Sequence, residues 1–128
     1  MNFILLSTEL VDRIHDHVLN PGELPGRSLD KSLEGALARV ENRLAYGMIA
    51  DAYDLAAAYA IAIAQGHCFN DANKRTAFRA MHAALALNGA ALDFDTVEVG
   101  QTIIRAAQRL LDEGELAEWL RQREIGRA

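Results

Sequence analysis

The 128-residue sequence predicts an all-α fold, and its composition and its apolar periodicity are the two observations that predict it. Alanine occurs 23 times and proline twice, while β-branched and aromatic residues are sparse, a balance that favours helices over strands. Apolar residues also recur at three- and four-residue steps, the spacing of one helix face. We therefore expect a single domain over residues 1–128 in which about six helices pack as a bundle.

Two amphipathic helices separated by a turn are expected in the first part of the chain. The first begins at Ser7 or Thr8, either of which can cap free N–H groups, and ends near Leu19. The second covers residues 32–46, where leucine, valine and alanine repeat at helical spacing. Residues 21–30 (PGELPGRSLD) hold both prolines and two glycines, so we expect an exposed turn or small β-hairpin-like flap there.

Four further helices are expected in the rest of the chain. The helix over residues 49–65 is apolar nearly all round, which places it in the middle of the bundle. The next helix begins near Asn73 and runs to Asn88-Gly89. A short extended piece around residues 92–94 leads to two last helices, with Gly114 expected to separate them; they cover residues 97–111 and 115–123.

Charge and cysteine content exclude several classes of protein. The formal net charge of -5, from 18 acidic and 13 basic residues, argues against a non-specific grip on nucleic acid or anionic membrane. The single cysteine, Cys68, rules out an internal disulfide and fits a reducing compartment. No apolar run approaches the length of a signal peptide or a membrane span. We expect a cytoplasmic protein that binds neither DNA nor a membrane directly.

Chemistry-bearing residues gather in the string GHCFNDANKRTA, where the third predicted helix gives way to the fourth. A helix that starts near Asn73 presents free N–H groups and a partial positive charge, which together attract anions. Lys74 and Arg75 would neutralise phosphate oxygens there. The chain has only two lysines, which argues that Lys74 is more than a solvated charge.

A histidine and a carboxylate precede these cations. Asp71 offers the hard oxygen that Mg²⁺ takes when its other ligands are phosphates and water. Histidine titrates near neutral pH, so His67 suits the removal of a proton from an attacking hydroxyl. The residue types of the whole string therefore predict a site for phosphoryl or nucleotidyl transfer.

The pattern His67-x-Phe69-x-Asp71-x-Asn73-Lys74-Arg75 resembles the signature loop of the Fic/Doc family, and HxFNDANKRTA is similar to its Doc (death on curing) toxin branch. The resemblance extends over roughly residues 5–92. It is carried outside the loop by Leu24-Pro25-Gly26, Glu34-Gly35-Ala36-Leu37, Tyr46, and a post-loop helix that ends in Asn88-Gly89.

The resemblance implies a Fic fold that binds ATP and Mg²⁺ and transfers a nucleotide-derived group to a protein hydroxyl. Most of the family transfers AMP, whereas Doc-like toxins are kinases that phosphorylate a threonine of elongation factor Tu with the γ-phosphate. The AMP-transferring pattern has glycine at the position of Lys74 and a second arginine at that of Phe78. Arg79 comes one residue later, about 100° around a helix. Both departures favour the kinase.

The resemblance also implies a role for each residue. His67 would be the general base and Asp71 the Mg²⁺ ligand, while Asn73, Lys74 and Arg75 would bind phosphate. Family members with a built-in brake carry a Ser/Thr-x-x-x-Glu-Gly/Asn helix, and no serine or threonine here has glutamate four places later. The expected inhibitor is therefore a Phd-like antitoxin acting in trans.

Other interpretations remain open at this point. Many relatives carry a basic residue where this chain has Gln65, so a phosphate contact is either missing or supplied by another arginine, such as Arg27 in the flap. AMP transfer, or a catalytically inactive module that only binds the antitoxin, are the alternative functions. The absence of GxxxxGK[ST] and GxGxxG excludes P-loop and eukaryotic-type kinases.

The same residues also have plain structural interpretations. Asp71 and Asn73 are good helix caps without any ligand, and a lone His67 would more often be a polar residue at a helix end. We interpret Cys68 as a small buried thiol, not a nucleophile. His15 and His17 are two residues apart on a predicted helix and do not face each other, so a zinc pair is not expected.

Overall fold

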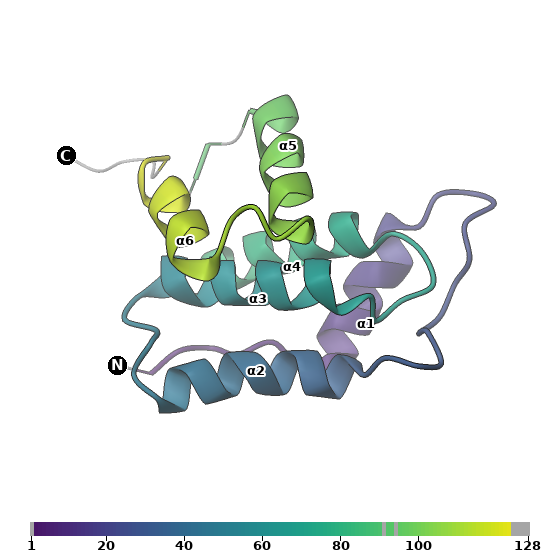
Figure 1. The fold of residues 1–128 in the computed structure, drawn as a ribbon, viewed down its shortest axis with the longest axis horizontal. Helices are drawn as coiled ribbons and strands as arrows, with labels where there is room; N and C mark the ends of the chain where they lie inside the picture. The colour runs from purple at the N-terminus through teal and green to yellow at the C-terminus, as the bar shows by residue number, and fades with distance from the viewer. Residues whose placement is uncertain (1, 91, 94, 124–128) are drawn as a thin grey trace.

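The computed structural model describes residues 2–90, 92–93 and 95–123, which form six helices and confirm the all-α fold (Figure 1). Every predicted helix is present, with ends that differ from the expected ones by at most four residues. The helices are α1 (Thr8–Val18), α2 (Leu33–Ala45), α3 (Ala52–Gly66), α4 (Asn73–Leu87), α5 (Thr96–Ala107) and α6 (Glu113–Arg121).

Side-chain caps fix where most of the helices begin. Five of the six have a serine or aspartate N-cap whose side chain accepts the N–H three residues on: Ser7, Ser32, Asp51, Asp95 and Asp112. At α6, Asp112 and Glu115 form a reciprocal capping box. The expected helix break at Gly114 is therefore wrong, because this cap starts the helix at Glu113 and places Gly114 in its first turn.

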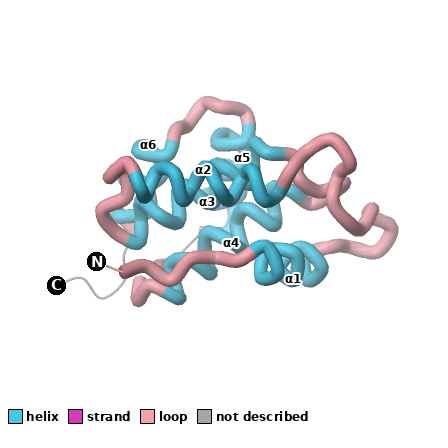
Figure 2. The backbone as a smooth tube through the Cα atoms, turned by 90° about the horizontal axis from the view of Figure 1, so that it is seen from below, coloured by secondary structure: helices cyan, strands magenta, loops and turns pink. Residues whose placement is uncertain are grey.

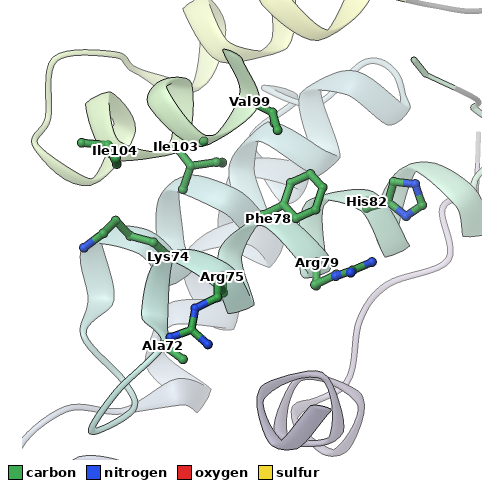
Figure 3. A pocket seen from close by; sticks show the side chains of 10 residues that line it. Ala72, Lys74, Arg75, Phe78, Arg79, His82, Val99, Ile103 and Ile104 are labelled. Atoms are coloured by element: carbon green, nitrogen blue, oxygen red, sulfur yellow. The ribbon is translucent and has the colours of Figure 1, made fainter. Parts of the chain in front are cut away.

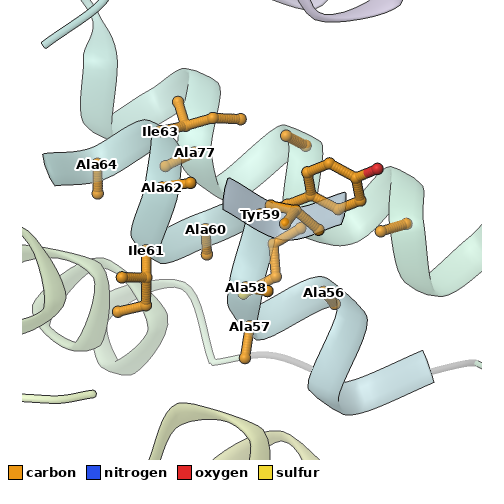
Figure 4. Packing of buried hydrophobic residues seen from close by; sticks show 14 of the residues in the cluster. Ala56, Ala57, Ala58, Tyr59, Ala60, Ile61, Ala62, Ile63, Ala64 and Ala77 are labelled. Atoms are coloured by element: carbon orange, nitrogen blue, oxygen red, sulfur yellow. The ribbon is translucent and has the colours of Figure 1, made fainter. Parts of the chain in front are cut away.

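Helix α3 is the centre of the bundle. It packs against α2, α4, α5 and α6, and in Figure 1 it lies between α2 on one side and α5 and α6 on the other. Every residue from Leu55 to Ala64 is buried, and six of these ten are alanine (Figure 4). Such small side chains let neighbouring helices approach from all sides, as the apolar character of this segment predicts.

The segment between α1 and α2 does not fold into the expected hairpin. Residues 21–30 contain no strand, and Figure 2 shows them as a loop that projects at one end of the bundle. Its two prolines lack N–H donors, and Gly22 and Gly26 turn the chain at φ 88° and 85°, so the segment follows an irregular path. It pairs instead with the α3–α4 loop, through one isolated antiparallel bridge between Arg27 and Phe69. We keep the name flap for residues 21–30.

One expectation reaches the limits of the described residues. Leu92 lies in an isolated bridge and the N–H of Asp93 donates to the carbonyl of Arg123 at 3.3 Å. Phe94 lies outside the described residues, so the extended piece expected over residues 92–94 is only partly described. No helix in the described ranges is long and apolar enough to cross a membrane.

Arg121 ties α6 to the start of α3. Its guanidinium donates to both carboxylate oxygens of Asp51, at 3.0 and 3.1 Å, and to Asp54 at 2.7 Å. Burial acts to raise the pKa of Asp51, but hydrogen bonds from Arg121 and from the N–H of Asp54 outweigh it and hold this pKa below its ordinary value. Asp51 therefore caps one helix and docks another.

Substitution Asp51→Asn, which keeps a cap acceptor but removes the charge, is expected to lower the free energy of unfolding at pH 7 by about 1 kcal/mol after solvent screening. Because the folded-state pKa is depressed, this contribution is present above pH ~4 and disappears as the pH falls through the folded-state value. Urea unfolding at pH 7 and pH 3 measures it. Asp95→Asn, at a cap that has no arginine partner among the described residues, is the control, and a deficit as large at pH 3 as at pH 7 would contradict the assignment.

Candidate active site

The loop between α3 and α4 turns sharply at both ends. His67, the C-cap of α3, has φ 49° and ψ 41°, and Ala72, the N-cap of α4, has φ 64° and ψ 27°. Left-handed backbone is unusual for residues other than glycine and persists where the surroundings hold it. A Cβ on Gly66 would lie 2.9 Å from the sulfur of Cys68, because the loop folds back onto the last turn of α3. The turn buries Cys68 and Phe69 and exposes His67.

Asn73 holds this loop closed with its side-chain amide. Its Oδ1 accepts the N–H of Phe69 at 3.1 Å, and its Nδ2 donates to the carbonyl of Phe69 at 2.9 Å. The Phe69 ring is 2% exposed and stacks on the ring of His15 in α1. Asn73 thus satisfies the backbone of a buried residue, and both polar atoms of its side chain are used in doing so.

The N-terminus of α4 is left open. Ala72 provides no side-chain cap and the first turn of α4 has no acidic residue, in contrast to the other five helices. The first turn contributes Lys74 and Arg75 instead. Free N–H groups, the positive end of the helix and a lysine therefore coincide, as an anion-binding site requires.

A cavity of about 760 Å³ lies between α4 and α5 at this open helix end (Figure 3). The α4 wall combines basic and apolar side chains and the α5 wall is apolar, so the cavity suits a ligand with an anionic and an apolar part. Its lining is Ala72, Lys74, Arg75, Phe78, Arg79 and His82 from the α4 side and Val99, Gly100, Ile103 and Ile104 from α5. A second cavity of about 520 Å³ continues past Arg75 and Arg79 to α1.

The residues predicted to bind phosphate differ from one another in how far their side chains are engaged within the chain. Arg75 is hydrogen-bonded to the Glu23 carboxylate and to the carbonyl of Val18, so it fastens the flap and the end of α1 to α4. The hydrogen bond from Arg75 to Glu23, with one from the N–H of Asn20, lowers the pKa of the Glu23 carboxyl. Lys74 is exposed, lines the larger cavity, and has no hydrogen bond or ion pair among the described residues. Of the three residues, Lys74 has the side chain available to a ligand.

His67 and Asp71 lie on the loop and do not line the cavity. The ring of His67 is exposed and has no hydrogen-bond partner within the described ranges, while its carbonyl accepts the hydroxyl of Ser28 at 2.8 Å. The Asp71 carboxylate accepts the N–H of Leu24 in the flap at 2.8 Å. Both chemical groups therefore sit where the flap meets the loop, beside the open end of α4.

A single carboxylate at this position limits how a metal ion would bind. The described residues contain no group of three or more histidine, cysteine, aspartate or glutamate side chains able to hold a metal. Mg²⁺ commonly takes one or two protein carboxylates and completes its shell with phosphates and water. Asp71 fits that pattern, so Mg²⁺ would arrive with a phosphate ligand and not be held by the protein alone.

Arg27, named above as a candidate for the cation that is missing at Gln65, is bonded to two carboxylates. Its guanidinium donates two hydrogen bonds to Asp12, at 3.0 and 2.6 Å, and one to Glu34 at 2.6 Å, and it is half-buried. Arg109 is an arginine that contacts Gln65. Its guanidinium donates to the Oε1 of Gln65 at 2.8 Å, and its backbone is left-handed with φ 63°. No local sequence signal indicates this contact, which joins residues 44 positions apart.

Comparison with known proteins matches the same part of the chain. The model of the Fic/DOC family matches residues 5–85, which include the flap, the loop and nearly all of α4. Protein kinase doc of Escherichia phage P1 is 36% identical over 118 residues, which are 91% of this chain and 93% of that protein. Helix α5, the apolar wall of the larger cavity, lies beyond the family match.

Removal of the Asn73 side chain is expected to destabilise the protein, because Asn73→Ala leaves the N–H and the carbonyl of buried Phe69 without partners. The expected loss is about 2 kcal/mol in the free energy of unfolding, measured by urea denaturation. Asn42→Ala is the control, since Asn42 is exposed on α2 and its side chain has no partner among the described residues. Equal unfolding midpoints for the two variants would refute the role given to Asn73.

Proposed function

Because the chain belongs to the Fic/DOC family, we propose that it is the toxin of a toxin–antitoxin module. In this proposal it is a kinase that transfers the γ-phosphate of ATP to a threonine hydroxyl of elongation factor Tu. The modification blocks translation. One observation carries the proposal: an uncapped, basic helix end beside an exposed histidine, in a chain that is similar to a phage protein kinase. The open N–H groups and Lys74 provide what a phosphate chain needs.

The reaction divides among the residues of the loop and of the α4 terminus. His67 takes the proton of the threonine hydroxyl as its oxygen attacks the γ-phosphorus. The bond from the γ-phosphorus to the bridging oxygen breaks, and ADP leaves with that electron pair. The first N–H groups of α4 and Lys74 stabilise charge on the phosphates. Mg²⁺, which Asp71 would help to hold, neutralises phosphate oxygens when it is bound with ATP.

The direction in which ATP binds decides between phosphate and AMP transfer. Lys74 and Phe78 stand at the two positions where the AMP-transferring pattern has glycine and arginine. Phe78 contributes an apolar ring to the larger cavity (Figure 3), and the guanidinium of Arg79 lies 5.6 Å from the centre of that ring. This arrangement supports the kinase, and AMP transfer remains the alternative that the label experiment below distinguishes.

We also infer that a separately encoded Phd-like antitoxin inhibits the enzyme. The family's internal inhibitory motif is not in the sequence, and the two connected cavities along α1, α4 and α5 combine apolar and basic side chains that suit an acidic amphipathic segment. The partner would also supply promoter binding, because the acidic chain itself is not suited to DNA. ATP and elongation factor Tu place the reaction in the cytoplasm.

Incubation of the purified protein with elongation factor Tu, Mg²⁺ and ATP labelled at either the γ or the α phosphate tests the proposal. We expect label on a threonine from the γ position only. His67→Ala should lower the rate at least about 100-fold by removing the base. Arg13→Ala, which removes an exposed side chain of α1 that lines neither of the two cavities, is the control and should keep the rate near that of the unmodified protein.

Label from the α position would replace phosphate transfer by AMP transfer. Failure to label from either position, in a protein that still binds its antitoxin, would leave the non-catalytic binding module as the function. Equal rates for His67→Ala and for the unmodified protein would contradict the role of His67.

A further inference from the structure

His15 is a buried histidine of α1 that contacts the α3–α4 loop at two points. Its side chain is 1% exposed, its ring stacks on that of Phe69 with centroids 3.9 Å apart and planes 8° apart, and its Nε2 lies 2.9 Å from the carbonyl oxygen of Asp71. Since a carbonyl only accepts hydrogen bonds, Nε2 carries the proton and donates. One side chain thus holds the loop at both Phe69 and Asp71.

The bond to Asp71 also sets the direction of a backbone N–H. In a trans peptide the C=O and the N–H point in opposite directions. Because the carbonyl of Asp71 points to His15, the N–H of Ala72 in the same peptide unit points away from α1. The next carbonyl, that of Ala72, accepts the Thr76 hydroxyl at 2.8 Å and the Thr76 N–H at 2.9 Å, which orients the N–H of Asn73.

Two buried polar side chains therefore orient the first N–H groups of the open helix end. His15 and Thr76 are two of the three buried polar or charged residues in the described chain. Neither lines either of the two cavities described above. Both bind backbone of the segment at which the proposed phosphate site begins.

We propose that His15 is a positioning residue for phosphate binding. By fixing Phe69 and the peptide between Asp71 and Ala72, it keeps the N–H of Ala72 directed to the phosphate chain and keeps the loop closed. The proposal rests on the proposed kinase function for its ligand. Its structural part concerns this chain alone, so the two can fail separately.

Two substitutions separate the contacts of His15. His15→Phe keeps a ring that can stack on Phe69 but removes the donor to Asp71. His15→Gln keeps an N–H donor of similar reach but removes the stacked ring. If orientation of the peptide is what matters, Gln should preserve function better than Phe.

Cys68 provides a readout of loop closure that needs no enzymatic activity. It is the chain's single cysteine, it lies between His67 and Phe69, and it is 1% exposed. Burial raises the pKa of its thiol, so a thiol reagent such as dithionitrobenzoate reacts slowly until the loop opens. The labelling rate of Cys68 therefore measures opening of this loop.

We expect His15→Phe to label at least about tenfold faster than the unmodified protein, and His15→Gln to label at an intermediate rate. Leu116→Val, which removes one methylene group from the buried face of α6, is the control for general loss of stability. Its labelling rate should follow its measured free energy of unfolding. The rate for His15→Phe should exceed the rate expected from its own unfolding free energy.

Kinetics with elongation factor Tu test the phosphate part. We expect His15→Phe to raise the KM for ATP about tenfold with a smaller change in kcat, and His15→Gln to restore most of the difference. The proposal would be overturned if Cys68 of His15→Phe is labelled no faster than its free energy of unfolding predicts. It would also be overturned if the KM of His15→Phe for ATP equals that of Leu116→Val. If the unmodified protein transfers no phosphate, the proposed function fails, and the Cys68 rates alone decide whether His15 closes the loop.

Discussion

The paired hydrogen bonds between the Asn73 side chain and the backbone of Phe69 are the interaction on which the site depends. These bonds hold the loop in which the chain leaves α3, a helix that is apolar on all sides, and enters α4. The loop contains two residues with left-handed backbone, one at each end. The Asn73 side chain is hydrogen-bonded to Phe69, which precedes it in the chain. The N-cap residue of α4 is Ala72, whose side chain cannot cap the helix. The open anion-attracting end is thus a consequence of how the loop is closed.

The same loop separates residues that hold the structure from residues that face a ligand. Asn73 and Arg75 are committed to bonds within the chain, and the carboxylate of Asp71 accepts an N–H of the flap. Lys74 and His67 remain exposed beside the free N–H groups. The formal net charge of the protein is -5, yet Lys74 and Arg75 make the start of α4 locally basic. Glu23 of the flap orients Arg75 through a hydrogen bond.

Sequence reasoning recovers what is periodic or local. The helices follow from composition and from the apolar pattern of the segments, and the loop residues follow from their types and order. The start of α6 differs from the expected one because the Asp112–Glu115 capping box begins the helix before Gly114. The partners of Arg75 and His15 were not predictable in this way, because they lie 57, 52 and 56 positions away and only packing brings them together. The hairpin-like form expected for the flap is absent for the same reason, because the flap pairs with Phe69, which is distant in the sequence.

The central claim is that the open end of α4 and Lys74 bind the phosphates of ATP, and calorimetric titration with ATP in the presence of Mg²⁺ tests it most directly. Replacement of Lys74 by alanine removes one charged contact to phosphate, so the dissociation constant should rise about tenfold or more. Lys31→Ala, the chain's other lysine, which is exposed just before α2, should bind as the unmodified protein does. Equal affinities for Lys74→Ala and Lys31→Ala would contradict the claim.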